Sequence, residues 1–264
     1  YTIYSGAQKM TFLEVVAKYY KFSNSIAGNS INNLRCEAVV ECMKDWSEYD
    51  SLENIKIWFE QEQKNCPMKI QNIPLSECEG WSFNHEQGTF GHDSGEFFYI
   101  QGLRVKNTTA REVTKGWDQP ILAQVGFNGG LLGLLRKKFN NIPYYLVEAK
   151  AEPGNPDKVQ ISPTLQATFS NLKRAHGGSK PKFANFFETP GSVNGIVLFD
   201  QWMSEDGGRL HLKRNRGMIV EIDESIKLPE MPTAYKWMTL HQIKDLIKIN
   251  SWVSPHIRSI ISHL

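Results

Sequence analysis

Three observations predict an α+β fold for this chain: helical patterns at both ends, period-two patterns between them, and one helical pattern embedded among the strands. Capping boxes at Thr11–Glu14 and Asp50–Glu53 open helices before any strand, and another at Thr239–Gln242 opens one after the strands. From Met68 the hydrophobic period changes to two. We therefore expect an N-terminal helical extension over residues 1–67, for packing or dimerisation, and an α+β module over residues 68–264.

Composition is that of a folded protein with no bias toward an anionic partner. The 264 residues are 41% hydrophobic and 22% charged, which is sufficient for a large core. Thirty basic and twenty-eight acidic residues leave a net charge of +2, so nothing favours binding to nucleic acid or a membrane surface. Because no apolar run approaches the roughly 20 residues of a membrane span and no signal peptide opens the chain, we expect a cytoplasmic protein.

The four cysteines predict neither a zinc site nor disulfides. Cys36, Cys42, Cys66 and Cys78 form no CxxC pair and have no histidine nearby at metal-ligand spacing. A chain of this length does not need disulfides for stability, so we expect free thiols in a reducing compartment.

The elements follow from these periodicities. The expected helices are residues 12–22, a second one with Leu34, Ala38, Val39, Cys42 and Ile31 on one face, a third through Ile55–Phe59, then residues 239–249 and 257–264. The expected strands are a hairpin of residues 81–83 and 89–90, followed by residues 97–105, 121–125, 131–139, 144–149, 196–202 and 211–222.

The stretch from Pro143 to Gly177 concentrates polar side chains. A strand over residues 144–149 ends at the turn Glu152–Asn155, and a helix is expected next, with Ser162 as N-cap and Pro163 in its first position. The polar residues of this stretch are Glu148, Lys150, Glu152, Gln160, Thr164, Gln166, Thr168 and Asn171. Such groups could converge on a small ligand. They are equally compatible with a buried strand edge beside a solvated helix face.

Four further clusters are candidates for a site. His92 lies in a glycine-bracketed turn, although a lone loop histidine is usually only solvated. Arg111 and Glu112 are compatible with a simple ion pair. Trp117 and Gln119 suit stacking on a base and reading its edge, or a core corner. The basic strand Lys213–Arg216 suits a solvated sheet edge, and its arginine forks also match a diphosphate.

Six motifs in this order resemble one known family. They are HDSGEFFYIQGLRV, REVTKGWDQPI, EAKAEPGN, QISPTLQATFSN, KRNRGMIVE and WMTLHQI. From about Trp81 to Leu264 the chain resembles the NDP-hexose 2,3-dehydratases of deoxysugar biosynthesis, which act on a nucleotide-linked 4-keto-6-deoxyhexose, typically a thymidine-diphosphate sugar. The resemblance implies a fold similar to Nudix hydrolases, usually present as two modules in tandem.

This chain departs from the family pattern in three ways. Each motif occurs once, so it resembles a single module. Gly217 stands where the family typically has asparagine, and Ser254-Pro255-His256 replaces an Asn-Met-Asp-like run. When the Nudix metal box is placed from Gly154, its glutamate positions fall on Gln160, Phe169, Leu172 and Lys173. Such side chains cannot form the oxygen cage that Mg²⁺ requires, so we expect a metal-free site.

The resemblance implies a reaction that needs a base, an acid and a donor to an oxyanion, with no cofactor. We expect Glu152 to act as base, with Lys150 stabilising the enolate and His92 as acid or base, although these roles are interchangeable at this point. The groups expected to bind substrate are Gln160, Thr164 and Gln166 at the sugar, Trp117 and Gln119 at the nucleoside, and Arg214 and Arg216 at the diphosphate, with Arg111 and Asn215 also lining the site.

Two other functions remain possible: a non-catalytic nucleotide-sugar-binding module, and a Nudix-type hydrolase, which the missing glutamates disfavour. A single module also suggests a homodimer that recreates the tandem pair, since two-fold dimers are the commonest oligomers. Trp46, Trp58 and Phe59 on the early helices are the expected interface residues.

Overall fold

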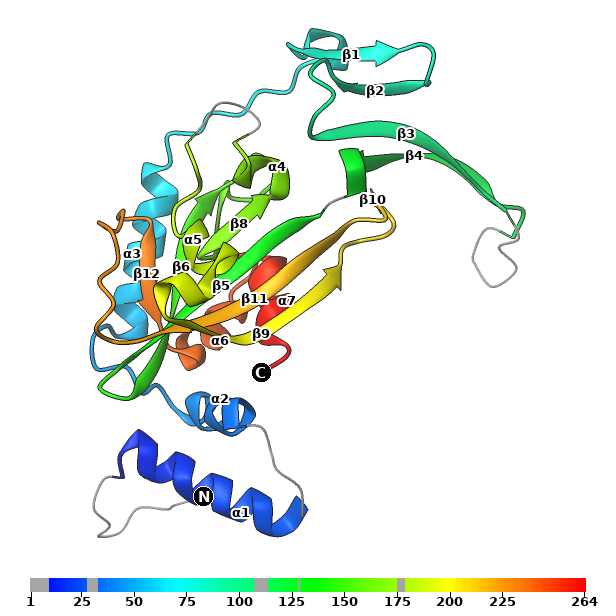
Figure 1. The fold of residues 1–264 in the computed structure, drawn as a ribbon. Coiled ribbons are helices and arrows are strands. Elements are labelled where there is room, and N and C mark those ends of the chain that lie inside the picture. The colour runs from blue at the N-terminus through cyan, green and yellow to red at the C-terminus, as the bar shows by residue number, and fades with distance from the viewer. Residues whose placement is uncertain (1–9, 28–32, 107–113, 128, 175–178) are drawn as a thin grey trace.

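The structure is a computed structural model that describes residues 10–27, 33–106, 114–127, 129–174 and 179–264. Its strands form two mixed sheets, and helices pack on both faces of the larger one (Figure 1). The predicted α+β fold is therefore confirmed. In the part of the chain that is described, no helix has the length and apolarity needed to cross a membrane. All four cysteines are free thiols.

The larger sheet has the strand order β12-β6-β5-β11-β9, with β7 added on β6 and β8 on β5. Its strands are β5 (Gly130–Phe139), β6 (Ile142–Ala151), β7 (Val159–Pro163), β8 (Leu165–Thr168), β9 (Gly195–Ser204), β11 (Arg214–Ile222) and β12 (Tyr235–Met238). Strands β5 and β11 run parallel, whereas the other pairs are antiparallel.

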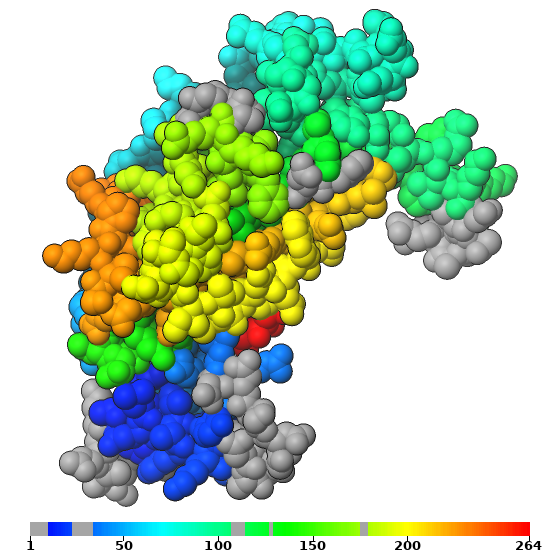
Figure 2. Space-filling model, viewed as in Figure 1, coloured from blue at the N-terminus to red at the C-terminus, as the bar shows by residue number. Residues whose placement is uncertain are grey.

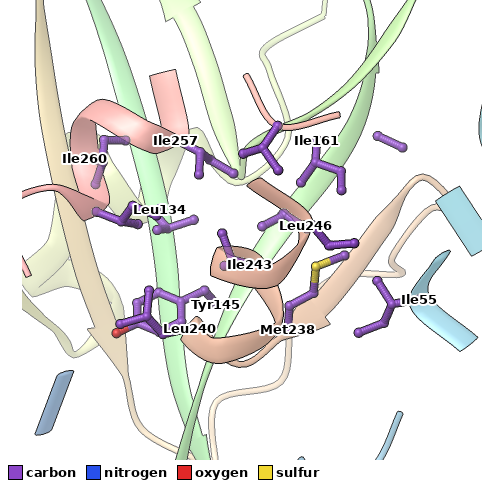
Figure 3. Packing of buried hydrophobic residues seen from close by; sticks show 14 of the residues in the cluster. Ile55, Leu134, Tyr145, Ile161, Met238, Leu240, Ile243, Leu246, Ile257 and Ile260 are labelled. Atoms are coloured by element: carbon purple, nitrogen blue, oxygen red, sulfur yellow. The ribbon is translucent and has the colours of Figure 1, made fainter. Parts of the chain in front are cut away.

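The helices lie in two layers. One face of the larger sheet carries α2 (Asn33–Met43), α3 (Leu52–Asn65), α6 (Leu240–Ile247) and α7 (Pro255–Ile261), and the other carries α4 (Phe169–Leu172) and α5 (Ala184–Glu188), while α1 (Phe12–Ala27) packs on α2. Figure 3 shows the first interface, where Leu134 and Tyr145 of the sheet meet Leu240 and Ile243 of α6 and Ile257 of α7. These fully buried side chains fix α7 against the sheet.

The early helices share this core with the sheet. Ile55 and Phe59 of α3 are fully buried, and the Trp58 indole donates a hydrogen bond to the Thr233 carbonyl at 2.8 Å. The helix is capped by Ser51, whose hydroxyl accepts from the Asn54 N–H, rather than by Asp50 as the predicted box implied. The predicted capping box at Thr239–Gln242 is present and opens α6.

The smaller sheet is β1-β2-β3-β4-β10, and it extends from the main body at the end away from α1 (Figure 2). Its strands are β1 (Trp81–Asn84), β2 (Thr89–His92), β3 (Phe98–Val105), β4 (Trp117–Gln124) and β10 (Leu210–His211), preceded by the short helix η1 (Leu75–Glu77). The predicted hairpin is confirmed as β1 and β2. Residues 211–222, predicted as one strand, are interrupted at Leu212, which has a φ of 52°.

Two segments of chain pass from the smaller sheet into the larger one side by side. Strand β4 leads through the turn η2 (Val125–Phe127) into β5, and β10 leads into β11; both pairs, β4 with β10 and β5 with β11, are parallel. Both segments are interrupted between their two strands: β4 ends at Gln124 and β5 begins at Gly130, while β10 ends at His211 and β11 begins at Arg214. These two neighbouring interruptions are called here the double break. There Lys213 Nζ donates to Gln124 Oε1 at 2.7 Å, and Gln124 Nε2 donates to the Gly129 carbonyl at 2.8 Å. This double break positions the candidate site.

The prediction of a helix that begins at Ser162 is wrong. Residues 159–168 form β7 and β8, and only Phe169–Leu172 is helical. Ser162 lies opposite Glu148 and Pro163 opposite Val147 in the ladder with β6. The Thr164 hydroxyl then donates to the Leu146 carbonyl and accepts from the Leu135 N–H. Pairing with β6 outweighs the local cap signal, and Pro163, as the last strand residue, needs no N–H. Strand β12 and helix α5 were not predicted.

Candidate functional site

A cavity of about 410 Å³ opens beside the double break and is called here the junction cavity. Its lining residues are Phe98, Leu122 and Leu210 from the smaller sheet, Gly130, Leu132, Lys150, Glu152, Gln166, Ala167, Thr168 and Asn215 from the larger sheet, and Asn171, Glu205, Lys213 and His256. Gly130 is required here, because a Cβ at this position would lie 2.8 Å from Asn215 Oδ1 and 2.9 Å from the Ala167 carbonyl oxygen. The backbone at Gly130 therefore lies close to Asn215 and Ala167, beside the polar groups of the cavity.

Four of the predicted site residues meet in the junction cavity: Lys150, Glu152, Gln166 and Asn215. Gln166 Nε2 donates to Glu152 Oε1 at 2.9 Å, which fixes the carboxylate at the end of β6. Lys150 Nζ lies 3.7 Å from Glu148 Oε2, and burial raises the pKa of Glu148. An ammonium and an oriented carboxylate therefore face the same space.

Three cavity residues with titratable side chains were absent from the predicted site: Glu205, Lys213 and His256. Lys213 Nζ donates to Asn215 Oδ1 at 2.8 Å, and Asn215 Nδ2 donates to Glu205 Oε1. His256 Nε2 lies 3.4 Å from the same Glu205 oxygen. The hydrogen bond from His256 lowers the pKa of Glu205, and burial lowers the pKa of Lys213. The result is a continuous polar network along one wall.

A second hollow of about 550 Å³, called here the outer hollow, adjoins the junction cavity. Glu152 and His256 line both spaces. Gln160, another predicted site residue, lines the outer hollow, and its Nε2 donates to the Ser251 carbonyl at 2.8 Å. Arg258 lines it as well and has no carboxylate partner among the described residues.

His92 lies apart from these two spaces. It lines a hollow of about 590 Å³ on the smaller sheet, together with Ser82 and Asp93 but without Glu152 or Lys150. Its Nδ1 is 2.7 Å from Ser94 Oγ and accepts the Ser94 backbone N–H at 3.2 Å. The structure therefore separates the predicted histidine from the predicted base.

The groups expected at the nucleoside are paired with one another. Trp117 Nε1 donates to Gln119 Oε1 at 2.6 Å, and Gln119 Nε2 donates to the Gly208 carbonyl at 3.0 Å. Both residues belong to β4, and neither lines the junction cavity or the outer hollow. Arg111 lies outside the described residues.

Arg214 and Arg216 alternate with Asn215 along β11, so their side chains point to the face opposite the cavity. Both nitrogens of the Arg216 fork contact Asp200, one at 2.7 Å, and the Arg214 guanidinium lies over the Trp202 ring at 4.6 Å. Thr164 is also outside the cavity lining, since its hydroxyl joins β5 to β6.

The backbone after Gly154 also differs from that of the Nudix metal box. The box needs a helix, whereas the segment that follows Gly154 forms strands β7 and β8. Within the described ranges, no three His, Cys, Asp or Glu side chains are close enough together to hold a metal ion. A metal-free reaction stays a prediction for experiment.

Residues 52–264 match a family model described as NDP-hexose 2,3-dehydratase. Two similar curated proteins are dTDP-4-dehydro-6-deoxy-alpha-D-glucopyranose 2,3-dehydratases. The one from Amycolatopsis orientalis is 34% identical over 80% of this chain and 44% of its own length, and the one from Streptomyces violaceoruber is 36% identical over 78% and 45%. The chain thus spans less than half the length of these relatives.

Among solved structures, similarity is found to a Nudix hydrolase from M. smegmatis, RenU, at 15% identity, with 53% of this chain and 89% of that one covered and a TM-score of 0.32. An Ap4A hydrolase from C. elegans gives 12% identity, coverage of 51% and 92%, and a TM-score of 0.29.

Proposed function

The chain belongs to the NDP-hexose 2,3-dehydratase family, and on this premise we propose that it removes the C2 hydroxyl of a nucleotide-linked 4-keto-6-deoxyhexose. The observation that carries the proposal is the meeting of Glu152, Lys150 and Gln166 in the junction cavity, where a carboxylate, an ammonium and an amide face one space. The names of the relatives support thymidine diphosphate as the nucleotide.

The proposed chemistry begins at C3 of the sugar. The neighbouring C4 ketone acidifies the C3 proton, and Glu152 removes it to form an enolate. Gln166 holds Oε1 of this carboxylate, while Oε2 has no hydrogen-bond partner among the described residues and is free to take the proton. Lys150 stabilises the negative charge that develops at the C4 oxygen. The enolate expels the C2 hydroxyl, and the resulting enol tautomerises to the 3,4-diketone.

A direct assay tests this function. Purified protein is incubated with the thymidine-diphosphate 4-keto-6-deoxyglucose, with and without chelator, and an aromatic 1,2-diamine traps the vicinal diketone as a quinoxaline. We expect trapped product in both samples. Binding without product would support the non-catalytic module instead. Chelator-sensitive cleavage of the diphosphate would support the hydrolase.

We also propose a cytoplasmic homodimer, which remains supported by the family's usual tandem modules. The three residues expected at the interface do not support it, because Phe59 is fully buried, Trp58 packs against the core and Trp46 packs against Phe12. Exposed apolar side chains on the early helices, Phe22 at 62% and Met43 at 55%, are better candidates. Light scattering at micromolar concentration should give the mass of two chains.

A further inference from the structure

The proposed elimination needs an acid that protonates the departing C2 hydroxyl, and the structure offers a candidate that sequence patterns did not. His256 lines both the junction cavity and the outer hollow, and Glu152 is the other residue that lines both spaces. A sugar placed against Glu152 therefore lies in a space that this imidazole also lines.

The position of His256 is set by three neighbours in sequence. Ser254 caps α7 by accepting the Ile257 N–H at 3.4 Å, and Pro255 occupies the first helical position. Ile257 is fully buried in the core under the larger sheet. Because the cap and the buried isoleucine fix the first turn, the ring of His256 cannot drift far from the cavity.

One ring nitrogen is oriented and the other is open. Nε2 lies 3.4 Å from Glu205 Oε1, which also accepts a hydrogen bond from Asn215. Nδ1 has no partner among the described residues. A histidine with one nitrogen held by a carboxylate and the other without a protein partner is able to pass a proton to a substrate in a cavity that it lines.

We propose that His256 is the general acid of the dehydration and that Glu205 is its positioning residue. This inference depends on the proposed function. The Nδ1–H proton passes to the C2 oxygen as the C2–O bond breaks, so that the hydroxyl leaves as water and neutral imidazole remains. The enol then transfers its hydroxyl proton to imidazole, and Glu152 returns the proton taken from C3 to C2. Both groups are restored, and the net change is loss of one water.

The charged groups around the imidazole are of both signs. Glu205 faces Nε2, and Glu152 lines the same two spaces; Lys213 and Lys150 line the junction cavity, and Arg258 follows on the same helix. Within the described part of the chain, Glu205 is the one charged group paired with the ring. The acid must carry its proton, so activity is expected to fall at alkaline pH with the ionisation of this group.

The test separates the two proton transfers in D₂O. When only the base acts, the C3 proton is removed and replaced by deuterium from the solvent. Product formation also requires the acid. The variant His256→Asn should lose product formation by roughly 10²-fold or more, the usual contribution of a general acid, yet keep C3 exchange and nucleotide-sugar binding. It should also lose the alkaline limb of its pH–rate profile. Glu205→Gln should move that limb to lower pH, because the anionic partner is gone.

The chain supplies a matched control in His241 and Asp245 of α6. This pair is 3.5 Å apart with side chains 25% and 24% exposed, against 3.4 Å, 24% and 22% for His256 and Glu205, but it lines neither space. His241→Asn should leave product formation unchanged. Product from wild type with normal product from His256→Asn would overturn the inference alone. Loss of C3 exchange together with product in His256→Asn would overturn it as well. If the wild-type protein shows neither product formation nor C3 exchange, the proposed function is overturned.

Discussion

The same two parallel strands, β5 and β11, carry a polar cluster at each end, and the two clusters differ in what they face. At the far end, Arg136 is 1% exposed, and it contacts Glu37, Glu41 and Glu221 as well as the Tyr145 hydroxyl. These charges face each other, with helix α2 closing over them. At the near end, beside the double break, Lys213, Asn215, Glu205 and His256 form an equally connected network, but it lines a cavity.

The difference shows how a structural cluster is distinguished from a binding one on this sheet. Around Arg136, one guanidinium is surrounded by three carboxylates, so the attractions are satisfied within the fold. Around Lys213, cations and amides line open space, and Glu152 has an unpaired oxygen there. We expect changes at the far end to alter stability and changes at the near end to alter activity.

The largest effect is expected at the closed cluster. Arg136→Met leaves Glu41 and Glu221 without their cation, whereas Glu37 keeps Lys138 at 2.8 Å. Removing one partner of a buried ion pair costs about 3–5 kcal/mol of unfolding free energy. Burial already raises the pKa of Glu41, and without the opposing charge of Arg136 the folded pKa of this carboxyl should rise further. A carboxyl with a raised folded pKa favours the fold when protonated, so the variant should regain stability as pH falls from 7 toward about 4.3.

Urea denaturation at several pH values measures this effect. Arg104→Met is the control, since Arg104 also pairs with a carboxylate, Asp118, but on the exposed smaller sheet, where little change is expected. Equal stability of Arg136→Met and wild type at pH 7 would show that the cluster does not hold α2 on the sheet.

The next effect is expected at the proposed base. Glu152→Gln keeps the shape of the side chain but removes the charge, and it should lower turnover by roughly 10²-fold or more with little change in substrate affinity. Unlike His256→Asn, it should also abolish C3 exchange in D₂O. Asp157→Asn, on the same β6–β7 turn but outside both spaces, is the control. A near-normal rate would move the base role to another cavity residue.

The smallest effect is expected on the opposite face of β11. Arg216→Ala removes a guanidinium that Asp200 already holds, so KM should change less than about threefold. Lys213→Met, one strand position before the arginines but inside the cavity, should raise KM by roughly tenfold, in the range of a hydrogen bond from a charged group. A larger KM effect at Arg216 than at Lys213 would place the diphosphate on the outer face, as the sequence pattern suggested.

The sequence predicted the helices and strands better than the tertiary contacts between them. The dipeptide Ser-Pro occurs at 162–163 and at 254–255, in each case at or just before the start of a predicted helix. Ser254 caps a helix, because its neighbours pack as a helix on the sheet. Ser162 does not, because Val159 and Ile161 are buried as strand residues against β6. The same local signal gave opposite outcomes, since tertiary pairing decided between them.

Only part of the site could be predicted from the sequence, and the reason is related. Lys150, Glu152 and Gln166 lie within one stretch of chain, so their proximity followed from local spacing. His256 and Glu205 come from distant elements, and only the packing of α7 and the end of β9 brings them together. His92 attracted attention through its glycines, but these serve the hairpin: a Cβ on Gly91 would lie 3.1 Å from the Tyr99 Cβ, and Gly95 has a φ of 70°.

The order of the cavity lining along the chain has a consequence for folding. Its walls come from β3, β4, β5, β6, β8, β10, β11, α4 and α7 and from residues beside these strands and β9, and His256 follows all the other contributors in sequence. During synthesis, therefore, the larger sheet can begin to assemble before the site is complete. Contacts between residues so distant in sequence form late, because the loop-closure entropy is lost before they are made. On the proposed function, the full set of groups that would contact the substrate is assembled once α7 has docked, so substrate binding would report the docking of this helix.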